Sequence, residues 1–464
     1  MTANVHRQLV VGLKLRDKFA TLADAQQQFG SLVDELQKFL GSFGAQPAGF
    51  HVTRPHADVG WTAQVVLDIP NGTPAQVMAG DKPRYVEWWE PNTVLRLAGF
   101  SDPMWPASQW GLRRIGALET WNTAVQTPVT VAIVDSGVMW HWDRVRNEVT
   151  RAHEDLDGRA PGDAFPPRLW RSAEQPQMDG QDDDNNGYID DLNGARTVGK
   201  SYPGKLGDGE IGDEQGHGTM LAGIMFATPD NATGLASPLS PYWRNIRLMP
   251  VKFFDADTRP TPANARQAIE YAADNGAKII VASWHIGPGP RGYNPIERAV
   301  KYAWSKGALV VCAAGNDGSN NDRYPTWPAN FSGMFDNVLS VHATNRRDYK
   351  PAFSNYGRVS VHLGAPGVRI ATTGRYIGRR PVYQSINGTS AACAFASLAA
   401  AMVLAVQTDR GRPLTPAEII QHLVATADVV PQLHRCSSSG ARLNLANAVN
   451  TPFGTAAQAP ARPA

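Results

Sequence analysis

The chain has 464 residues, of which 42% are apolar and 19% are charged, as in ordinary globular proteins with one large and one small domain or two to three domains of usual size. Its 44 basic and 42 acidic residues give a formal net charge of +2, which argues against nucleic acid or an anionic membrane as a partner. The three cysteines, Cys312, Cys393 and Cys436, show neither metal-ligand spacing nor a disulfide framework, so we interpret them as core or surface thiols.

The N-terminus contains no apolar stretch of signal-peptide length and no small-residue cleavage site. The sequence therefore predicts a cytoplasmic protein if Met1 is native, and a secreted one if a signal has been removed. The longest apolar run, Ala391 to Val406, is shorter than the about 20 residues that a bilayer span needs, and it contains Ser397. We predict that this run forms a buried helix.

The first hundred residues differ in pattern from the rest of the chain. A strand-like QLVVGLKL precedes a helical ADAQQQFGSLVDELQKFLGSFG, and the strand-like TAQVVLDI and RYVEWWEPNTVLRL follow, which indicates a small α+β domain over residues 1–100. The segment from Gly99 to Leu112 is rich in proline and turn formers and is the predicted joint. A second domain is expected over residues 101–450, and the Ala-, Pro- and Gly-rich tail 451–464 is predicted to be disordered.

From Pro128 onward, apolar β-rich runs alternate with helical patterns, which predicts a parallel sheet wrapped by helices. The predicted strands are Val129–Asp135, Ile246–Phe254, Lys278–Trp284, Leu309–Asn316, Val338–Thr344 and Val359–Ala365. Their near-continuous apolarity indicates burial on both faces of the sheet. Helix starts are predicted where a polar residue precedes proline, at Thr261-Pro262, Asn294-Pro295 and Thr415-Pro416.

Four polar residues stand at the edges of these elements. Asp135 ends the first buried strand in IVDSGV, His217 lies between glycines in GHGTMLAGI, Ser390 begins a helix in INGTSAACAF, and Asn316 ends a strand in AAGN. Taken singly, such an aspartate is often a turn residue and such a histidine is often only exposed. Together, an Asp, a His and a Ser in this chain order form one of the known arrangements of the acyl-transfer triad.

The motifs DSG, HGT, AAGN and NGTS together resemble those of the subtilisin-like serine proteases, the subtilase family, and the resemblance runs from about Asp102 to Val449. It implies an α/β, subtilisin-like three-layer fold in residues 101–450, with a mostly parallel seven-stranded sheet. It also implies a serine endopeptidase that hydrolyses peptide bonds of protein or peptide substrates through an acyl-enzyme.

Mapped onto this sequence, the resemblance makes Ser390 the nucleophile, His217 the general base and then acid, and Asp135 the carboxylate that orients the imidazole. It makes Asn316 the side chain of the oxyanion hole, together with the backbone N–H of Ser390. The chemistry agrees, because a serine hydroxyl is a poor nucleophile at neutral pH without a base held in place by a third group. Gly388 is expected to allow a tight turn and close approach of the substrate.

The sequence departs from the family pattern in two places. After the serine, the usual Met-Ala-Thr-Pro-His is replaced by Ala391, Ala392, Cys393, Ala394 and Phe395, so local helix packing is expected to differ. In ASWHIGPG, which matches the substrate-binding strand, His285 stands where glycine is usual. We expect the primary substrate pocket to be formed by Ser283, Trp284, His285, Ala313, Ala314 and Gly315. We hypothesise that His285 narrows or polarises this pocket, and the alternative is an exposed loop histidine.

The segment DGQDDDNNGYIDDLNG packs six acidic residues into sixteen, which would repel one another without a cation. Oxygen donors fall at EF-hand-like positions, with Gly187 at the sharp turn. The predicted ligands are Asp182, Asp184, Asn186, the carbonyl of Tyr188, and Asp190. Asn193 replaces the usual glutamate at the twelfth position, and Asp191 is an alternative ligand. Because the segment contains no histidine, we expect structural rather than catalytic Ca²⁺, and the alternative is a solvated acidic loop.

Subtilases commonly begin with a small α+β propeptide that assists folding and inhibits the enzyme, and residues 1–100 are similar to it in element order. The resemblance implies a zymogen. If residues 1–100 are a propeptide, we predict self-cleavage after Phe100, with Leu97 to Phe100 added as an edge strand to the cleft. The alternative is a retained accessory domain. Two other functions stay open at this point: a catalytically silent subtilase fold acting as a binding module, and an esterase or transferase that uses the same acyl-enzyme.

Overall fold

The chain forms two compact units, Met1–Ala98 and Gly99–Ala464, here called the N-terminal unit and the large unit. The division falls at the predicted joint. The computed structural model describes residues 8–14, 22–41, 46–56, 60–68, 86–91, 102–104, 108–121, 123–143, 148–159, 166–172, 179–199, 205–229, 231–239, 243–255, 260–286, 294–375 and 382–455. The predicted edge strand Leu97 to Phe100 and the tail from residue 456 onward lie outside these residues.

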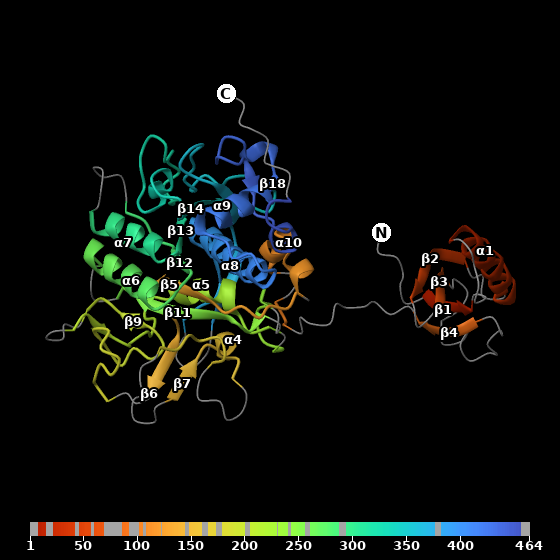
Figure 1. The fold of residues 1–464 in the computed structure, drawn as a ribbon, viewed down its shortest axis with the longest axis horizontal. Coiled ribbons are helices and arrows are strands. Elements are labelled where there is room, and N and C mark those ends of the chain that lie inside the picture. Colours follow the sequence, from red (N-terminus) through yellow and green to blue (C-terminus); the bar gives the residue numbers. More distant parts are fainter. Residues whose placement is uncertain are drawn as a thin grey trace. The chain divides into compact units, whose positions relative to one another are not determined.

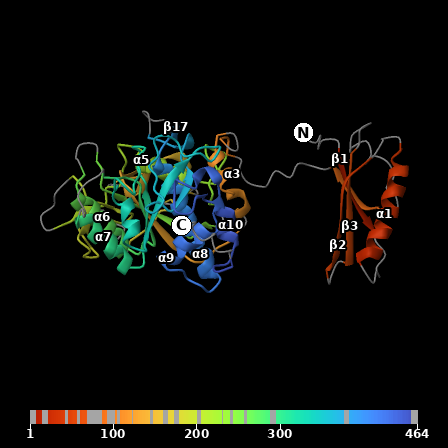
Figure 2. The same ribbon diagram turned by 90° about the horizontal axis from the view of Figure 1, so that it is seen from above.

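The N-terminal unit is an antiparallel sheet with one helix. Its strands are ordered β2-β3-β1-β4, with bounds Gln8–Lys14 (β1), Gln46–His56 (β2), Gly60–Asp68 (β3) and Val86–Pro91 (β4). Helix α1 (Leu22–Phe39) lies along the sheet and buries Val33 and Leu36 (Figure 2). The unit is therefore α+β. The sequence pattern did not predict β2. This strand contains two prolines, and its pairing with β3 shifts register at two points.

The centre of the large unit is a parallel sheet, whose order is β15-β14-β13-β12-β5-β11 (Figure 1). The strands are β5 (Val129–Asp135), β11 (Ile246–Lys252), β12 (Ile279–Ala282), β13 (Leu309–Ala313), β14 (Val338–Thr344) and β15 (Leu363–Pro366). Nearly every residue in them is buried, as expected for strands covered on both faces.

The sheet has more strands than the seven that we expected. Two-residue strands extend it at both ends, so that it has eleven strands in the part of the chain that the structure describes. They are β8 (Tyr188–Ile189), β9 (Ala195–Arg196), β10 (Gly207–Asp208), β18 (Asp428–Val429) and β19 (Ala441–Arg442). Such short pairings come from long connecting segments that run along the sheet edge, and they have no apolar periodicity to reveal them.

Helices cover both faces of this sheet and make the three layers. Alternate residues of β5 divide between two cores: Val131 and Ile133 pack with α5 (His217–Phe226) and α8 (Thr389–Asp409). Ala132 and Val134 pack with α6 (Pro262–Asp274) and α7 (Asn294–Ser305) on the other face. Helices α9 (Pro416–Ala425) and α10 (Leu445–Asn450) contact α8. The predicted α/β fold with a mostly parallel sheet is confirmed.

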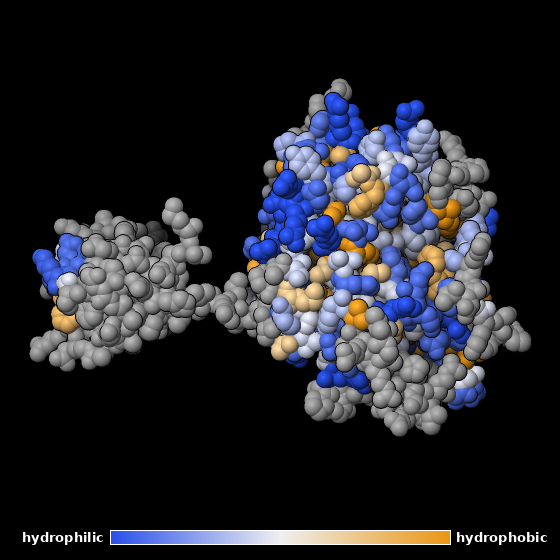
Figure 3. Space-filling view, turned by 180° about the vertical axis from the view of Figure 1, so that it is seen from behind, coloured by the Kyte–Doolittle hydropathy of each residue, from blue (hydrophilic) through white to orange (hydrophobic). Residues whose placement is uncertain are grey.

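Smaller elements complete the large unit. They are α3 (Trp110–Arg114), α4 (Glu154–Asp157), the hairpin β6 (Trp140–Asp143) and β7 (Glu148–Ala152), the pair β16 (Ile370–Thr373) and β17 (Tyr383–Ile386), and the 3-10 helices η3 (Ala117–Thr120), η5 (Ala329–Gly333) and η6 (Pro431–Leu433). Seen from behind, the large unit shows mostly polar side chains with small, separated apolar areas (Figure 3). Among the described residues, the largest apolar clusters are the two cores on either side of the sheet.

Two predictions about helices are confirmed. Helices α6 and α9 begin with capping boxes, in which Thr261 and Thr415 accept from the backbone N–H three residues on. Helix α8 is a buried helix, as expected, although it is longer than the apolar run that predicted it. Among the described residues it is the one helix long and apolar enough to cross a membrane, and its apolar window is 100% buried within the fold.

Candidate active site

The four predicted residues converge at the carboxyl edge of the parallel sheet. Asp135 is the last residue of β5, and Asn316 follows the end of β13. His217 is the first residue of α5, and Ser390 lies in the first turn of α8. Because the carboxyl ends of parallel strands meet at one edge, residues distant in sequence come together here.

Asp135 and His217 form a direct pair. His217 Nδ1 lies 2.9 Å from Oδ1 and 3.0 Å from Oδ2 of Asp135, whose side chain is 1% exposed, whereas the imidazole is 28% exposed. The backbone N–H of Ser136 donates to Asp135 Oδ1 at 2.8 Å. A carboxylate at Nδ1 favours the tautomer with its proton there, which leaves Nε2 to accept a proton.

The electrostatics of the pair favour a charged imidazole. Burial by itself would lower the pKa of His217, but the charge of Asp135, its hydrogen bond and the charge of Asp213 together raise the pKa above its usual value. The site can therefore hold an imidazolium next to a carboxylate, which is the state that a base reaches after it has taken up a proton.

Ser390 is buried at the start of α8, where its hydroxyl donates to the backbone carbonyl of Ser283 at 3.1 Å. The helix behind it packs through small residues, since Ala391 and Ala392 are fully buried. Phe395, one of the residues that depart from the family pattern, packs against Gly111. A Cβ on Gly111 would lie only 3.0 Å from the Phe395 ring, so the aromatic ring occupies the space that a side chain at position 111 would need.

Asn316 is oriented by its neighbours in α8. Its Oδ1 accepts from the N–H of Thr389 at 2.9 Å and from the Thr389 hydroxyl at 3.0 Å, and the N–H of Gly315 donates to that hydroxyl at 3.2 Å. With the amide oxygen held in this way, the Nδ2 group is the donor end of the amide.

Gly388 keeps open the space next to these donors. A Cβ built on it would lie 3.6 Å from Ser390 N and 3.7 Å from Asn316 Nδ2, so it would stand in front of both. Its φ of 163° is extended backbone, which other residues adopt, and the chain bends at this residue just before α8 begins. Glycine matters here for the close approach of a substrate and not for a special φ.

The structure places the predicted pocket residues in different surroundings. Ala313 and Ala314 are buried at the end of β13, and Gly315 has a φ of +112° and packs so closely that an added Cβ would lie 2.4 Å from Asn355 Nδ2. The side chain of Trp284 lies in the core. Its indole donates to the Val134 carbonyl at 3.0 Å, in the core below the sheet edge.

His285 lies at the edge of this segment with a buried, unsatisfied nitrogen. Its Nδ1 has no hydrogen-bond partner among the described residues, and Asp317 Oδ2 is 4.0 Å away, beyond hydrogen-bonding distance. The imidazole is 26% exposed, so it is only partly covered by protein. A buried polar atom without a partner costs free energy, so a substrate or water atom that paired with it would bind favourably.

Sequence reasoning missed a buried polar network behind the pocket. Asn321 Nδ2 donates to the Ala314 carbonyl at 2.8 Å, and its Oδ1 accepts from Asn355 Nδ2 at 3.0 Å and from the Thr326 hydroxyl at 3.2 Å. The N–H of Asp317 donates to Asn355 Oδ1 at 2.9 Å. These bonds hold the segment between β13 and Asp317 in place. In the sequence, the asparagines have the appearance of ordinary turn formers.

The acidic loop is closed by its own hydrogen bonds. Asp182 accepts from the N–H groups of Asn186 and Gly187, both at 3.0 Å, and from Lys205 Nζ at 2.5 Å. Asp184 Oδ1 accepts from the Asn186 N–H at 3.1 Å. Among the residues that the structure describes, no group of three or more His, Cys, Asp or Glu side chains has metal-site geometry.

The two neighbouring carboxylates, Asp190 and Asp191, contact different parts of this loop. Asp191 Oδ2 accepts from Asn186 Nδ2 at 2.8 Å and from the Tyr271 hydroxyl at 2.6 Å, and its Oδ1 is buried without a partner in the described chain. Burial, and after it the charge of Asp191, raises the pKa of Asp184. Asp190, at a φ of +53°, instead accepts from the Gly180 N–H at 3.1 Å. Asp190, at the ninth position of the EF-hand count, thus contacts the first turn of the segment, and its role as a ligand stays a prediction.

Known proteins resemble this chain over most of its length. The subtilase family matches residues 126–455. Thermitase of Thermoactinomyces vulgaris is 30% identical over 292 residues, which cover 63% of this chain and 80% of the relative. The thermophilic serine proteinase of Bacillus sp. (strain AK1) is 31% identical over 386 residues, which cover 83% of this chain and 77% of the relative.

Solved structures show the same fold at lower identity. A protease of Pseudoalteromonas arctica aligns with a TM-score of 0.55 and 21% identity over 75% of this chain and 98% of its own. The epidermin leader peptide processing serine protease of Staphylococcus aureus aligns with a TM-score of 0.53 and 19% identity over 96% of this chain and 98% of its own. From the family match and these relatives, the chain belongs to the subtilase family and is a serine-type endopeptidase that acts on peptides or proteins.

Proposed function

We propose that the enzyme cleaves peptide bonds with Ser390 as nucleophile, His217 as base and then acid, and Asp135 as the group that holds the imidazole. Asn316 Nδ2 and the N–H of Ser390 are the proposed oxyanion donors. The main support is the pairing of His217 Nδ1 with both oxygens of Asp135, at 2.9 and 3.0 Å. The hydrogen bond from the N–H of Thr389, next to Ser390, to Asn316 Oδ1 supports the proposed oxyanion donors.

The reaction begins when the Ser390 hydroxyl breaks its hydrogen bond to the Ser283 carbonyl. Ser390 Oγ then attacks the substrate carbonyl carbon. His217 Nε2 takes the hydroxyl proton, and the oxyanion forms beside Asn316 Nδ2 and the Ser390 N–H. His217 then gives the proton to the leaving amine, which departs. Water attacks the acyl-enzyme while His217 takes its proton, and His217 returns that proton to Ser390 Oγ as the acid product departs. The vacated Ser283 carbonyl is available to a substrate N–H.

The test compares the parent with Ser390→Ala in peptide hydrolysis and in labelling by a fluorophosphonate, which reacts with activated serines. We expect turnover and labelling in the parent only. Labelling and turnover that persist in Ser390→Ala would contradict the assignment, and a fully folded parent without either activity would favour a silent binding module. Ester substrates cleaved in place of peptides would favour an esterase.

We further propose that His285 shapes the preference for the substrate residue before the cleaved bond. Support comes from the partly exposed ring at the end of the substrate strand and its buried Nδ1 without a partner. His285→Gly should change the cleavage profile on a peptide library and broaden it toward larger side chains. Asp317→Asn is the matched control, because it removes the charge next to His285 and keeps the imidazole. An unchanged profile in His285→Gly would contradict the proposal.

We propose a structural Ca²⁺ held by Asp182, Asp184, Asn186, Asp191 and the Tyr188 carbonyl, with Asp191 in place of Asp190. Carboxylate, amide and carbonyl oxygens are the ligands that calcium prefers. The partnerless Oδ1 of Asp191 supports the fit, because a buried carboxylate oxygen needs a donor or a cation. The ammonium of Lys205 now lies on Asp182, so calcium would share or replace that contact. When bound, the ion would stabilise the loop and take no part in the reaction.

We propose that the N-terminal unit is a propeptide that assists folding and inhibits the enzyme until the chain cuts itself after Phe100. Its separate antiparallel α+β fold supports this proposal. Intact mass of the purified active protein should show loss of about the first hundred residues, and Ser390→Ala should keep its full mass. An active enzyme that retains residues 1–100 would favour the accessory domain.

A further inference from the structure

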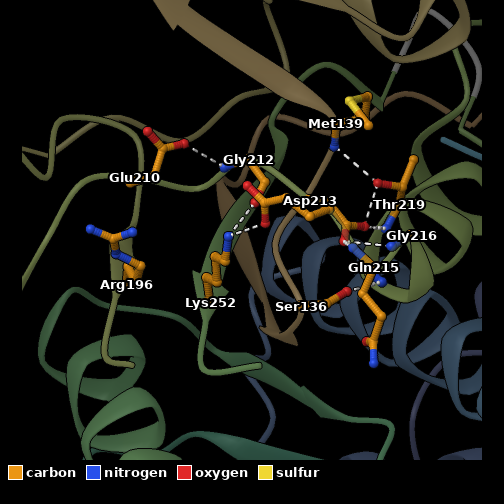
Figure 4. A network of polar contacts seen from close by, with 12 residues as sticks. Ser136, Met139, Arg196, Glu210, Gly212, Asp213, Gln215, Gly216, Thr219 and Lys252 are labelled. Carbon is orange, nitrogen blue, oxygen red and sulfur yellow. Dashed lines mark hydrogen bonds and ion pairs between the residues drawn. The ribbon is translucent and has the colours of Figure 1, made fainter. Parts of the chain in front are cut away.

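The loop that leads into α5 contains a buried carboxylate, Asp213, four residues before His217. Asp213 is 2% exposed, and its Oδ1 accepts from the N–H of Gly216 at 2.6 Å (Figure 4). Its Oδ2 accepts from the N–H of Thr219 at 2.9 Å and from the Thr219 hydroxyl at 2.6 Å. The carboxylate thus closes the first turn of the helix that begins with His217.

Thr219 connects this carboxylate to the segment that follows Asp135. Because its hydroxyl proton goes to Asp213, its oxygen is oriented to accept from the N–H of Met139, at 3.0 Å (Figure 4). A second link is parallel to the first. The N–H of Gly218 donates to the hydroxyl of Ser136 at 2.9 Å. Two polar links therefore join the strand end that bears the acid to the helix that bears the base.

The two segments also touch through their backbones. A Cβ on Gly218 would lie 2.0 Å from the carbonyl oxygen of Gly137 and 3.4 Å from Asp135 Cβ. A Cβ on Gly137, whose φ is +102°, would lie 2.5 Å from the Ile211 carbonyl. With no room for side chains between them, a small rotation of either segment would change the distance between Asp135 and His217.

Lys252 binds the loop that contains Asp213. It is the last residue of β11, where it pairs in register with Asp135, and its side chain is 1% exposed. Its Nζ donates to the Gly212 carbonyl at 2.7 Å and to Glu214 Oε2 at 2.5 Å (Figure 4). The residues on both sides of Asp213 are thereby fixed to the edge of the sheet.

We propose that Asp213 is a positioning residue, which holds the His217 imidazole against Asp135 by orienting Thr219 and the first turn of α5. The proposal rests on the proposed role of His217 as the base. Asp213 touches neither substrate nor Ser390 in this role, and it acts only through Thr219 and the helix.

Asp213 also adds negative charge near the imidazole. Burial raises the pKa of Asp213, while hydrogen bonds from Thr219 and Gly216 act in the opposite direction. All of its hydrogen-bonding neighbours donate, which requires acceptor oxygens of an ionised carboxylate. Among the described residues, the charges near this turn include Asp135 on β5, the Lys252 and Glu214 pair, Glu210, which accepts from the Gly212 N–H, and Arg375, which packs against Gly216. Loss of the Asp213 charge should lower the pKa of His217 and move the acid limb of kcat/KM to lower pH.

The experiment measures kcat, KM and their pH profiles for Asp213→Asn, Thr219→Val and Thr219→Ser in the full chain. Displacement of a catalytic group by less than 1 Å can cost about 100-fold, so we expect kcat to fall about 10- to 100-fold in Asp213→Asn with KM within about twofold. Its acid limb should move to lower pH. Thr219→Val should lose about 10-fold in kcat, and Thr219→Ser, which keeps the hydroxyl, should retain parental kcat.

Asp409→Asn is the matched control. Asp409 likewise accepts from two backbone N–H groups and a threonine hydroxyl, those of Gln126 and Thr127, but it lies at the far end of α8. Asp409→Asn should lower the melting temperature and leave kcat and the pH profile unchanged.

The proposal would be overturned if Asp213→Asn kept the kcat of the parent and the acid limb of its kcat/KM profile, and lost only melting temperature. If Asp213→Asn does not fold, parental kcat in Thr219→Val would overturn it. Failure of the proposed function gives a different result, because then the parent itself would neither hydrolyse peptides nor react with a fluorophosphonate.

Discussion

The hydroxyl of Ser390 donates to the backbone carbonyl of Ser283, 3.1 Å away. The hydroxyl proton of Ser390, the proposed nucleophile, is therefore engaged at the end of the proposed substrate strand. If a substrate N–H takes the Ser283 carbonyl, we expect the hydroxyl to be released toward His217. Under the proposed mechanism, substrate binding would then favour activation of Ser390.

Replacing Ser390 should abolish catalysis and leave the fold intact. Ser390→Ala should lower kcat about a millionfold, because the acyl-enzyme cannot form. Steady-state peptide hydrolysis measures the loss, and circular dichroism checks the fold. Ser385→Ala, an exposed serine on β17, is the control and should keep parental activity. A loss of less than about 100-fold in Ser390→Ala would point to another nucleophile.

Replacing Asn316 should affect the transition state and not the ground state. Asn316→Ala should lower kcat by about 100- to 1000-fold with KM little changed, since the lost donor serves the oxyanion. Thr389→Val removes the hydroxyl that donates to Asn316 Oδ1 at 3.0 Å and should cost less, about 10-fold. Equal rises of KM in both variants, with kcat unchanged, would indicate a binding role instead.

The pH dependence of kcat/KM should report on the Asp135 and His217 pair. The base works as neutral imidazole, so the rate rises as pH passes through the pKa of His217. Although burial opposes it, Asp135 raises this pKa, so the acid limb of the parent should lie above the usual pKa of about 6.5. Asp135→Asn should move the limb to lower pH and lower kcat by about 10,000-fold. An unmoved limb would mean that another group controls it.

His342 should make the large unit less stable in mild acid. Burial, its largest influence, lowers the pKa of His342 from 6.5 to about 4. Between pH 6.5 and 4, the unfolded chain binds this proton more strongly than the folded one. The free energy of unfolding therefore falls as pH decreases through this window, by about 3 kcal/mol in total, and the contribution is fully present above pH 6.5.

Denaturant unfolding at several pH values, in a Ser390→Ala background that prevents autolysis, measures this slope. His342→Leu should flatten it, because the uncharged side chain cannot take up a proton. His434→Leu, at an exposed position, is the control. Equal slopes in the parent and in His342→Leu would show that other groups cause the acid sensitivity.

Calcium should stabilise the enzyme through the acidic loop. Calcium at 100 times its Kd should add about 3 kcal/mol to the free energy of unfolding, and excess EGTA should remove it. Asp191→Asn should weaken this response, since Asp191 supplies the buried oxygen without a partner. Asp183→Asn, at an exposed position in the same loop, should leave it unchanged. A melting temperature insensitive to both calcium and EGTA would contradict the site.

Local physics in the sequence determined much of the fold. The runs Val129–Asp135 and Val338–Thr344 coincide with β5 and β14, because strands buried on both faces need continuous apolar side chains. Thr261 and Thr415 marked helix starts, because the cap depends only on residues three positions apart. The motifs also identified the residues that meet at the sheet edge.

Only the tertiary structure decided how those residues are held. The bond from Ser390 to Ser283 joins positions 107 apart, and the link from Thr219 to Met139 joins positions 80 apart. Likewise, contacts with Asn186 and Tyr271 place Asp191 at the acidic loop, and a bond to the Val134 carbonyl places the Trp284 indole in the core. Spacing along a chain determines periodicity and caps, but contacts between distant segments depend on how the packed layers bring them together.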